Sequence, residues 1–280
     1  MRAGIHLIAG IAVVVLGLGE STRAQTPQPL AACNGLNGAA LDVQIAGCTA
    51  LIKSGKYSGR NLAIVFNNRC NAHNRKRAYD LAIDDCTQAI KLDPNYVTPY
   101  SNRCIIYYNK DDYDRAIKDC TEVLRRDPSY EKAYSTRANA YSDKGDHDRA
   151  IRDYGEALRI NPNDPLTLNN RCDEFGLLGQ FRAALLDCNK SLKIRPNHAN
   201  TLRHRGLVLL ALGKFDEGIA DYANLLRQDP KDADALYGRG SAKLKKGDSA
   251  GGNSDVAAAK AINPNVEKGF WRYGALSEKH

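Results

Sequence analysis

The chain has 280 residues, of which 43% are apolar and 26% are charged. This composition is typical of a soluble globular protein of one or two domains, and it argues against a chain embedded in a membrane. The net charge of +8 favours acidic over basic partners in non-specific encounters. The basic residues are spread evenly and form no run, which equally fits a solvated surface and indicates no nucleic-acid partner.

Residues 1–24 have the features of a secretory signal peptide. Arg2 provides the positive start, an apolar stretch follows over Ile5–Leu18, and Thr22 and Ala24 supply small residues before a cleavage site. The stretch is shorter than the roughly 20 residues that span a bilayer. We therefore expect a periplasmic or secreted protein with no membrane insertion after signal cleavage.

Two alternatives concern this N-terminus. The first is an uncleaved anchor. The second is a lipoprotein processing site, because Leu30-Ala31-Ala32-Cys33 has the corresponding pattern. In such sites the apolar stretch runs directly into the cysteine, whereas here about a dozen polar-rich residues intervene. The signal peptide is therefore the preferred interpretation.

A proline recurs every 34 residues. The six positions are Pro94, Pro128, Pro162, Pro196, Pro230 and Pro264, and all but the fourth follow Asp or Asn. A fixed period of this length indicates tandem structural repeats. Within a period, apolar residues at three- and four-residue spacing predict two helices, which are separated by Asp111-Asp112 in one unit and by a glycine in others. Each proline then ends the second helix.

The small and large residues of each unit also recur in register. Position 4 is Phe66, Tyr100, Tyr134, Leu168, Leu202 and Leu236. Position 8 is Cys70, Cys104, Ala138, Cys172, Gly206 and Gly240. Position 20 is Ala82, Ala116, Ala150, Ala184, Gly218 and Gly252. This pattern closely resembles the tetratricopeptide repeat (TPR). The resemblance implies an all-α fold, an α-solenoid that winds as a right-handed superhelix of about six helix-turn-helix units.

This reading divides the chain into four parts. A signal peptide (1–24) precedes an N-terminal segment with a capping helix (25–62), six units (63–264), and a C-terminal capping helix and tail (265–280). We expect the N-terminal helix over Asp42–Ile52 and a closing helix over Val266–Leu276, with Trp271 against the last repeat. The sequence Ser249–Asn253 is a poor start for the second helix of the last unit.

Six of the eight cysteines fall at positions 8 and 24, always together in one unit. In the repeat these positions lie on facing helices, and exported proteins enter an oxidising compartment. We therefore expect disulfides Cys70–Cys86, Cys104–Cys120, Cys172–Cys188 and Cys33–Cys48. The alternative is a small core residue copied by duplication. No close-spaced Cys pair or His cluster indicates a metal site.

Arginine at position 7 and aspartate at position 23 recur in all six units. The arginines are Arg69, Arg103, Arg137, Arg171, Arg205 and Arg239. The aspartates are Asp85, Asp119, Asp153, Asp187, Asp221 and Asp255. A charge near a helix seam requires a fixed partner, so we expect structural ion pairs, within a unit or between neighbours. The alternative is that the arginines bind a ligand carboxylate.

The resemblance places several polar residues of the first helices on a concave groove. They are Asn67, Asn68, Asn71, Asn102, Lys132, Asn139, Asn169, Asn170, Arg203 and His204. Asparagine offers a donor and an acceptor, which suits the backbone of a bound peptide. The alternative is a solvated helix face without a ligand.

No catalytic or phosphate-binding motif occurs, and the repeats leave no room for a separate catalytic domain. We therefore expect no enzyme activity and no cofactor. The sequence favours a protein-interaction scaffold of the cell envelope that binds an unidentified protein or peptide. The alternatives are a structural assembly part and a binder of anionic envelope polymer.

Overall fold

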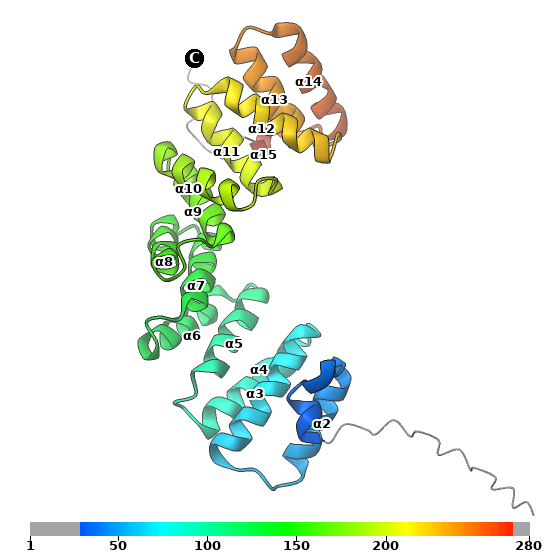
Figure 1. Cartoon of the computed structure of the whole chain (residues 1–280), viewed down its shortest axis with the longest axis vertical. Helices are drawn as coiled ribbons and strands as arrows, with labels where there is room; N and C mark the ends of the chain where they lie inside the picture. Colours follow the sequence, from blue (N-terminus) through cyan, green and yellow to red (C-terminus); the bar gives the residue numbers. More distant parts are fainter. Residues whose placement is uncertain (1–28, 271–280) are drawn as a thin grey trace, which may run out of the picture.

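The computed structural model describes residues 29–270, which form fifteen α-helices and one 3-10 turn and contain no strand within that range. Twelve of the helices make six consecutive antiparallel hairpins (Figure 1). The hairpins are α3 (Gly59–Arg75) with α4 (Tyr79–Leu92), α5 (Val97–Asn109) with α6 (Tyr113–Arg126), α7 (Glu131–Asp143) with α8 (His147–Ile160), α9 (Pro165–Leu177) with α10 (Phe181–Ile194), α11 (Ala199–Ala211) with α12 (Phe215–Gln228), and α13 (Ala233–Lys245) with α14 (Ser249–Ile262).

The turn within each hairpin requires one residue in the left-handed backbone region. Glycine fills that place in the last four hairpins, with φ between 70° at Gly179 and 89° at Gly247. Arg77 and Asp111 adopt the same conformation in the first two hairpins, each with φ of 58°. A Cβ atom makes this region unfavourable. Both residues are exposed, and backbone hydrogen bonds across each turn hold them there, with Arg77 N–H donating to the Asn74 carbonyl at 2.8 Å and Asp111 N–H to the Tyr108 carbonyl at 3.0 Å.

Small residues let the two helices of a hairpin approach closely. A Cβ atom added at Gly252 would lie 2.6 Å from the Leu244 side chain and 2.9 Å from the Gly240 carbonyl oxygen. The helix α14 also has an N-cap, because the Asp248 carboxylate accepts a hydrogen bond from the Gly251 N–H at 2.9 Å. Gly252, one of the residues that made this segment a poor helix start, is therefore needed for close packing, and a regular helix forms.

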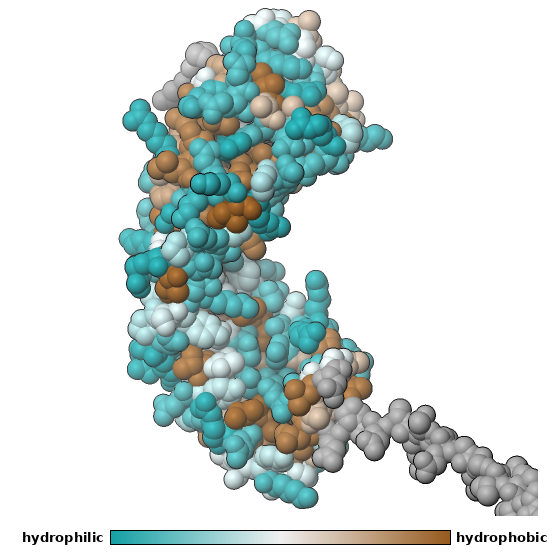
Figure 2. All heavy atoms as spheres, in the orientation of Figure 1, coloured by the Kyte–Doolittle hydropathy of each residue, from teal (hydrophilic) through white to brown (hydrophobic). Residues whose placement is uncertain are grey.

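The first helices of the hairpins lie on the inner side of the curve. Among the described helices, α3 contacts α5, α5 contacts α7, α9 contacts α11, and α11 contacts α13, whereas consecutive second helices are not in comparable contact. The described surface accordingly bends around a hollow (Figure 2). The prediction of an all-helical solenoid is confirmed.

The N-terminal end is a shortened hairpin rather than one helix. The helix α1 (Pro29–Cys33) and the turn η1 (Leu36–Gly38) precede α2 (Leu41–Lys53), which packs on α3. The helices α1 and α2 are so close that a Cβ atom at Gly47 would lie 2.8 Å from the Pro29 carbonyl oxygen. The sequence reading anticipated α2 and missed α1, because a five-residue helix shows no periodicity.

The C-terminal end is covered by α15 (Val266–Phe270). Phe270 is buried and its ring centre lies 5.1 Å from that of Tyr237. Trp271 and residues 1–24, to which the sequence assigns a closing contact and a signal peptide, lie outside the described residues. Within the described range, no helix combines the length and the apolar character that a bilayer crossing requires.

Candidate binding site on the concave face

Four buried disulfides stabilise the structure, and they join the pairs expected from the sequence. Three link the two helices of a hairpin: Cys70–Cys86, Cys104–Cys120 and Cys172–Cys188. The fourth, Cys33–Cys48, joins α1 to α2. With its sulfur in this bond, Cys33 has no thiol for the lipid attachment considered above.

Tyrosine replaces the disulfide in the third and fifth hairpins. Tyr154 and Tyr222 occupy position 24 there and are buried. The Tyr154 hydroxyl donates a hydrogen bond to the Asn139 amide oxygen at 2.5 Å on the inner side, whereas the Tyr222 hydroxyl has no hydrogen-bond partner within residues 29–270. A Cβ atom at Gly206 would lie 2.6 Å from the Tyr222 ring, and one at Gly238 would lie 2.4 Å from it. The absence of side chains at these two glycines therefore leaves space for the ring. In the sequence, these two units stand out only because they lack the cysteine pair at positions 8 and 24.

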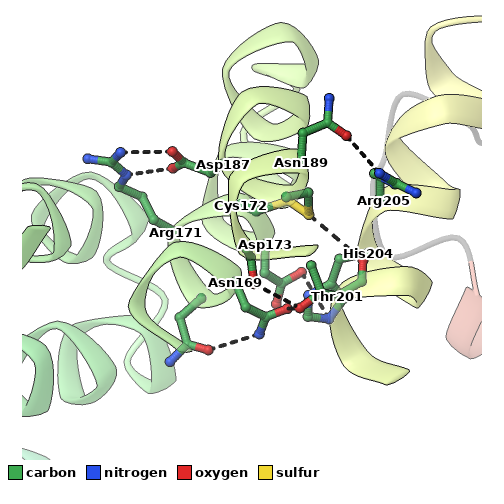
Figure 3. The surroundings of a disulfide bond; sticks show 12 residues. Asn169, Arg171, Cys172, Asp173, Asp187, Asn189, Thr201, His204 and Arg205 are labelled. Carbon is green, nitrogen blue, oxygen red and sulfur yellow. Dashed lines mark hydrogen bonds and ion pairs between the residues drawn. A yellow bond between two sulfur atoms is a disulfide. The ribbon is translucent and has the colours of Figure 1, made fainter. Parts of the chain in front are cut away.

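Each arginine at position 7 pairs with the aspartate at position 23 of its own hairpin. Arg137 donates from Nε and Nη2 to the two Asp153 oxygens, at 2.7 and 2.8 Å. The other five pairs have the same two-bond geometry. Figure 3 shows it for Arg171 and Asp187. The aspartates are buried and the arginine side chains are 16–25% exposed, so the pairs lie along the seam and fix the two helices together.

The same arginines also connect neighbouring hairpins, which the sequence analysis did not anticipate. Nη1 of Arg137 donates to the Thr121 hydroxyl of the preceding hairpin at 2.9 Å. Arg69, Arg103 and Arg205 donate in the same way to Thr49, Thr87 and Asn189. The corresponding residues before Arg171 and Arg239 are Gly155 and Ala223, which offer no side-chain acceptor. A recurring Thr or Asn one residue after position 24 was the available signal.

Most of the predicted groove asparagines bond to one another across hairpins. Amide nitrogens donate from Asn68 to Asn34 at 3.0 Å, from Asn102 to Asn67 at 2.9 Å, and from Asn170 to Asn139 at 3.2 Å. Asn67 and Asn169 are each only 5% exposed, and Asn169 accepts a bond from Thr201. The solvated alternative therefore does not fit these two residues, and they offer little surface to a ligand in the groove, because their amides hold adjacent inner helices in register.

The remaining groove residues are more accessible. Asn71 and Lys132 are exposed on α3 and α7. Arg203 donates to the Asp232 carboxylate at 2.7 Å, and Nε2 of His204 lies 3.8 Å from Asp173. Figure 3 shows Asp173 and His204 pointing toward each other between α9 and α11, on the side of α9 away from Arg171.

A polar cavity of about 200 Å³ opens between α7 and α9. It is lined by Tyr108, Asn139, Ser142, Asp143, Tyr154, Asn170, Asp173 and Glu174. Glu174 is only 2% exposed and accepts hydrogen bonds from Ser142 at 2.5 Å and, at 2.7 Å, from a ring nitrogen of His147 when it is protonated. Burial, and then the negative charge of Glu174, raise the pKa of Tyr154. Within residues 29–270, no three metal-ligating side chains are grouped to hold an ion.

The cavity brings together residues that the sequence analysis separated. Asn139 and Asn170 were predicted for the groove, whereas Asp143, Asp173 and Glu174 were not. Burial and a hydrogen bond with the Asp143 carboxylate raise the pKa of Tyr108, so its hydroxyl remains protonated at neutral pH. The cavity therefore offers carboxylate and amide oxygens as acceptors, with tyrosine hydroxyls beside them.

The chain was compared with curated proteins, with solved structures and with protein-family models. The comparison with curated proteins finds no match. Among solved structures, YrrB, described as a TPR protein with an unusual peptide-binding site, superposes with a TM-score of 0.60 at 24% identity, over 64% of this chain and 93% of that one. PilW, described as a type IV pilus biogenesis factor, has a TM-score of 0.61 at 16% identity, over 72% and 94%.

A tetratricopeptide repeat protein from Parabacteroides merdae has a TM-score of 0.59 at 16% identity, over 84% of this chain and 92% of that one. At these identities the likeness concerns the fold. Tetratricopeptide repeat models match residues 63–96, 98–130, 131–164 and 204–264, which is more than half of the chain. The hairpin of α9 and α10, in the unmatched interval, has the same geometry as its neighbours. The chain therefore belongs to the tetratricopeptide repeat family.

Proposed function

We propose that this protein is a non-catalytic interaction scaffold of the cell envelope, and that it holds a polypeptide partner along its concave face. Residues 1–24 would direct export, and residues 63–264 would form the binding solenoid between an N-terminal and a C-terminal cap. The TPR fold is generally a scaffold for protein interaction, which supports this proposal.

The observation that carries the proposal is the row of side-chain amides on the inner helices. An asparagine side chain has two N–H donors and two acceptor lone pairs. Asn68, Asn102 and Asn170 each use one donor toward the preceding unit, and Asn170 also accepts a bond from Asn169. Asn68, Asn102 and Asn170 are half-buried, so each keeps hydrogen-bonding capacity toward the hollow. Their repeat spacing suits an extended or helical backbone. YrrB, a protein of like fold, is described as having a peptide-binding site.

The assignment to the envelope rests on two observations. All eight cysteines are in disulfides, which persist in oxidising compartments and are rare in the cytosol. The first 24 residues have the pattern of a signal peptide. Determination of the N-terminus of the exported protein tests this part, and we expect it to begin at Gln25. A mature chain that retains residues 1–24 would contradict it.

Chemical crosslinking in the periplasm followed by affinity capture tests the binding role. We expect one defined polypeptide partner whose capture is weakened in an Asn71→Ala/Lys132→Ala variant. A Lys118→Ala/Lys190→Ala variant, changed at exposed residues of the outer helices α6 and α10, is the control and should capture normally. The alternative is that the protein binds an anionic polymer, which the net charge of +8 would favour. Capture of such a polymer at low salt, and its loss at moderate salt, would support that alternative.

A further inference from the structure

The polar cavity lies where the inner helices are furthest apart. Of the consecutive first helices in the described hairpins, α7 and α9 contact each other least. The hairpin of α7 carries Tyr154 where its neighbours carry a disulfide, and the Tyr154 hydroxyl reaches Asn139 on the inner side. In the fifth hairpin, the equivalent residue Tyr222 instead packs into the space left by Gly206 and Gly238. The cavity is therefore specific to the junction of these two hairpins. Figure 1 shows α7 and α9 near the middle of the solenoid.

The charge around this cavity is opposite to that of the whole chain. Three carboxylates line it, from Asp143, Asp173 and Glu174, and its described lining includes neither Lys nor Arg. Two of these carboxylates lie beside histidines, Glu174 beside His147 and Asp173 beside His204. A protein of net charge +8 thus presents a locally anionic cavity on its concave face.

The size of the cavity indicates how much of a ligand it receives. Sites for whole small molecules usually enclose about 300–1,000 Å³, and this cavity has about 200 Å³. It therefore suits one long side chain rather than a complete ligand. Lysine and arginine combine a slim apolar stem with three or five N–H donors and no acceptor, which complements a lining of carboxylate, amide and hydroxyl oxygens.

We propose that the cavity between α7 and α9 receives a lysine or arginine side chain of the polypeptide bound on the concave face. This inference rests on the proposed function and deepens it, because it makes a basic residue the anchor of the partner. Asp143 is exposed at the mouth and Asp173 is half-buried beside His204. A carboxylate accepts several hydrogen bonds, so both can also accept from the incoming cation, while Glu174 is the most deeply buried of the three and is held by Ser142 and His147.

A library of random peptides displayed on phage tests this inference with the oxidised full-length protein. We expect the selected peptides to share a Lys or Arg at one position. In an Asp143→Asn/Asp173→Asn variant this preference should disappear, and a selected peptide should bind about ten- to a hundredfold more weakly, the effect of losing a charged hydrogen bond. The isosteric changes keep the size of the lining, and the thermal midpoint checks folding.

The control removes one negative charge outside the cavity. Asp148 is exposed on α8, outside the cavity lining, and an Asp148→Asn variant should select the same basic peptides as the wild type. Selected peptides without a basic residue, or a basic preference that survives in the double variant, would overturn the inference and leave the proposed function standing. Failure of the wild-type protein to select any peptide would overturn both.

Discussion

The hydrogen bond from each arginine to the preceding hairpin can be tested at the junction that lacks it. Gly155 stands in α8 where Thr121 stands in α6, so Arg171 has no hydroxyl partner. A Cβ atom at Gly155 would lie 3.6 Å from Nη1 of Arg171, in ordinary van der Waals contact. A Gly155→Thr variant should therefore place its hydroxyl within reach of that guanidinium.

The contribution of the threonine hydroxyl to stability is obtained by comparison with a Gly155→Val variant. Valine has the same shape as threonine and nearly the same helix propensity. Both variants gain a few tenths of a kcal/mol because glycine disfavours helices. The threonine hydroxyl should add about 0.5–1.5 kcal/mol, the usual net contribution of one hydrogen bond. At about 2–4 °C per kcal/mol for a chain of this size, the two thermal midpoints should differ by about 1–6 °C.

Because repeat arrays can unfold in parts, amide hydrogen exchange of α8 and α9 should accompany the thermal measurement. We expect slower exchange at this junction in the threonine variant than in the valine variant. As a mirror test, Thr121→Val should cost a similar amount at the preceding junction, where the bond to Arg137 exists. Equal stability of the threonine and valine variants would refute the role assigned to these bonds.

Three further predictions concern the interior. Tyr222→Phe should leave the free energy of unfolding unchanged or raise it by about 1 kcal/mol, because its buried hydroxyl has no hydrogen-bond partner in the described part of the chain. Tyr154→Phe should instead lower it by about 1 kcal/mol through the lost bond to Asn139, and thermal melts distinguish the two variants. Reduction of the disulfides should lower the thermal midpoint markedly. Each disulfide closes a loop of 15 or 16 residues and should stabilise the folded state by about 3 kcal/mol in the chain-entropy model. Alkylation of the untreated protein should label no thiol. Burial alone would raise the pKa of Asp255, but hydrogen bonds from its arginine partner and Lys243 lower it below the ordinary value. Its charged form should thus stabilise the last hairpin above about pH 4, and that stability should be lost as pH falls through the lowered pKa; Lys243→Met should raise this pKa in an NMR titration.

The fold was predictable because each repeat marks the ends of its own helices with residues that are close in sequence. Proline every 34 residues ends the second helix of each unit, and small residues at fixed positions mark where helices approach. The disulfide pairs were also predictable, because cysteines at positions 8 and 24 occur together in a unit and lie on facing helices, as Cys104 and Cys120 do. These features depend on contacts within one unit, which a periodic sequence repeats.

Features that depend on the junction between two units were harder to predict. The sequence analysis treated Asn67 and Asn169 as ligand contacts, although each is buried against the next hairpin. It overlooked Glu174, because a single acidic residue in a helix usually faces solvent. The cavity arises from the spacing of α7 and α9 and from the tyrosine between them, which no single unit reveals.

The central claim is that the concave face binds a polypeptide, and site-specific photocrosslinking tests it most directly. A photoreactive amino acid is placed in the full-length exported protein at Lys132 on the inner helix α7 or, in a separate variant, at Lys190 on the outer helix α10, both of which are exposed. After irradiation of intact cells, we expect a defined crosslinked polypeptide from position 132 and none from position 190. Crosslinks from position 190 alone would contradict the claim and make the convex face the binding surface.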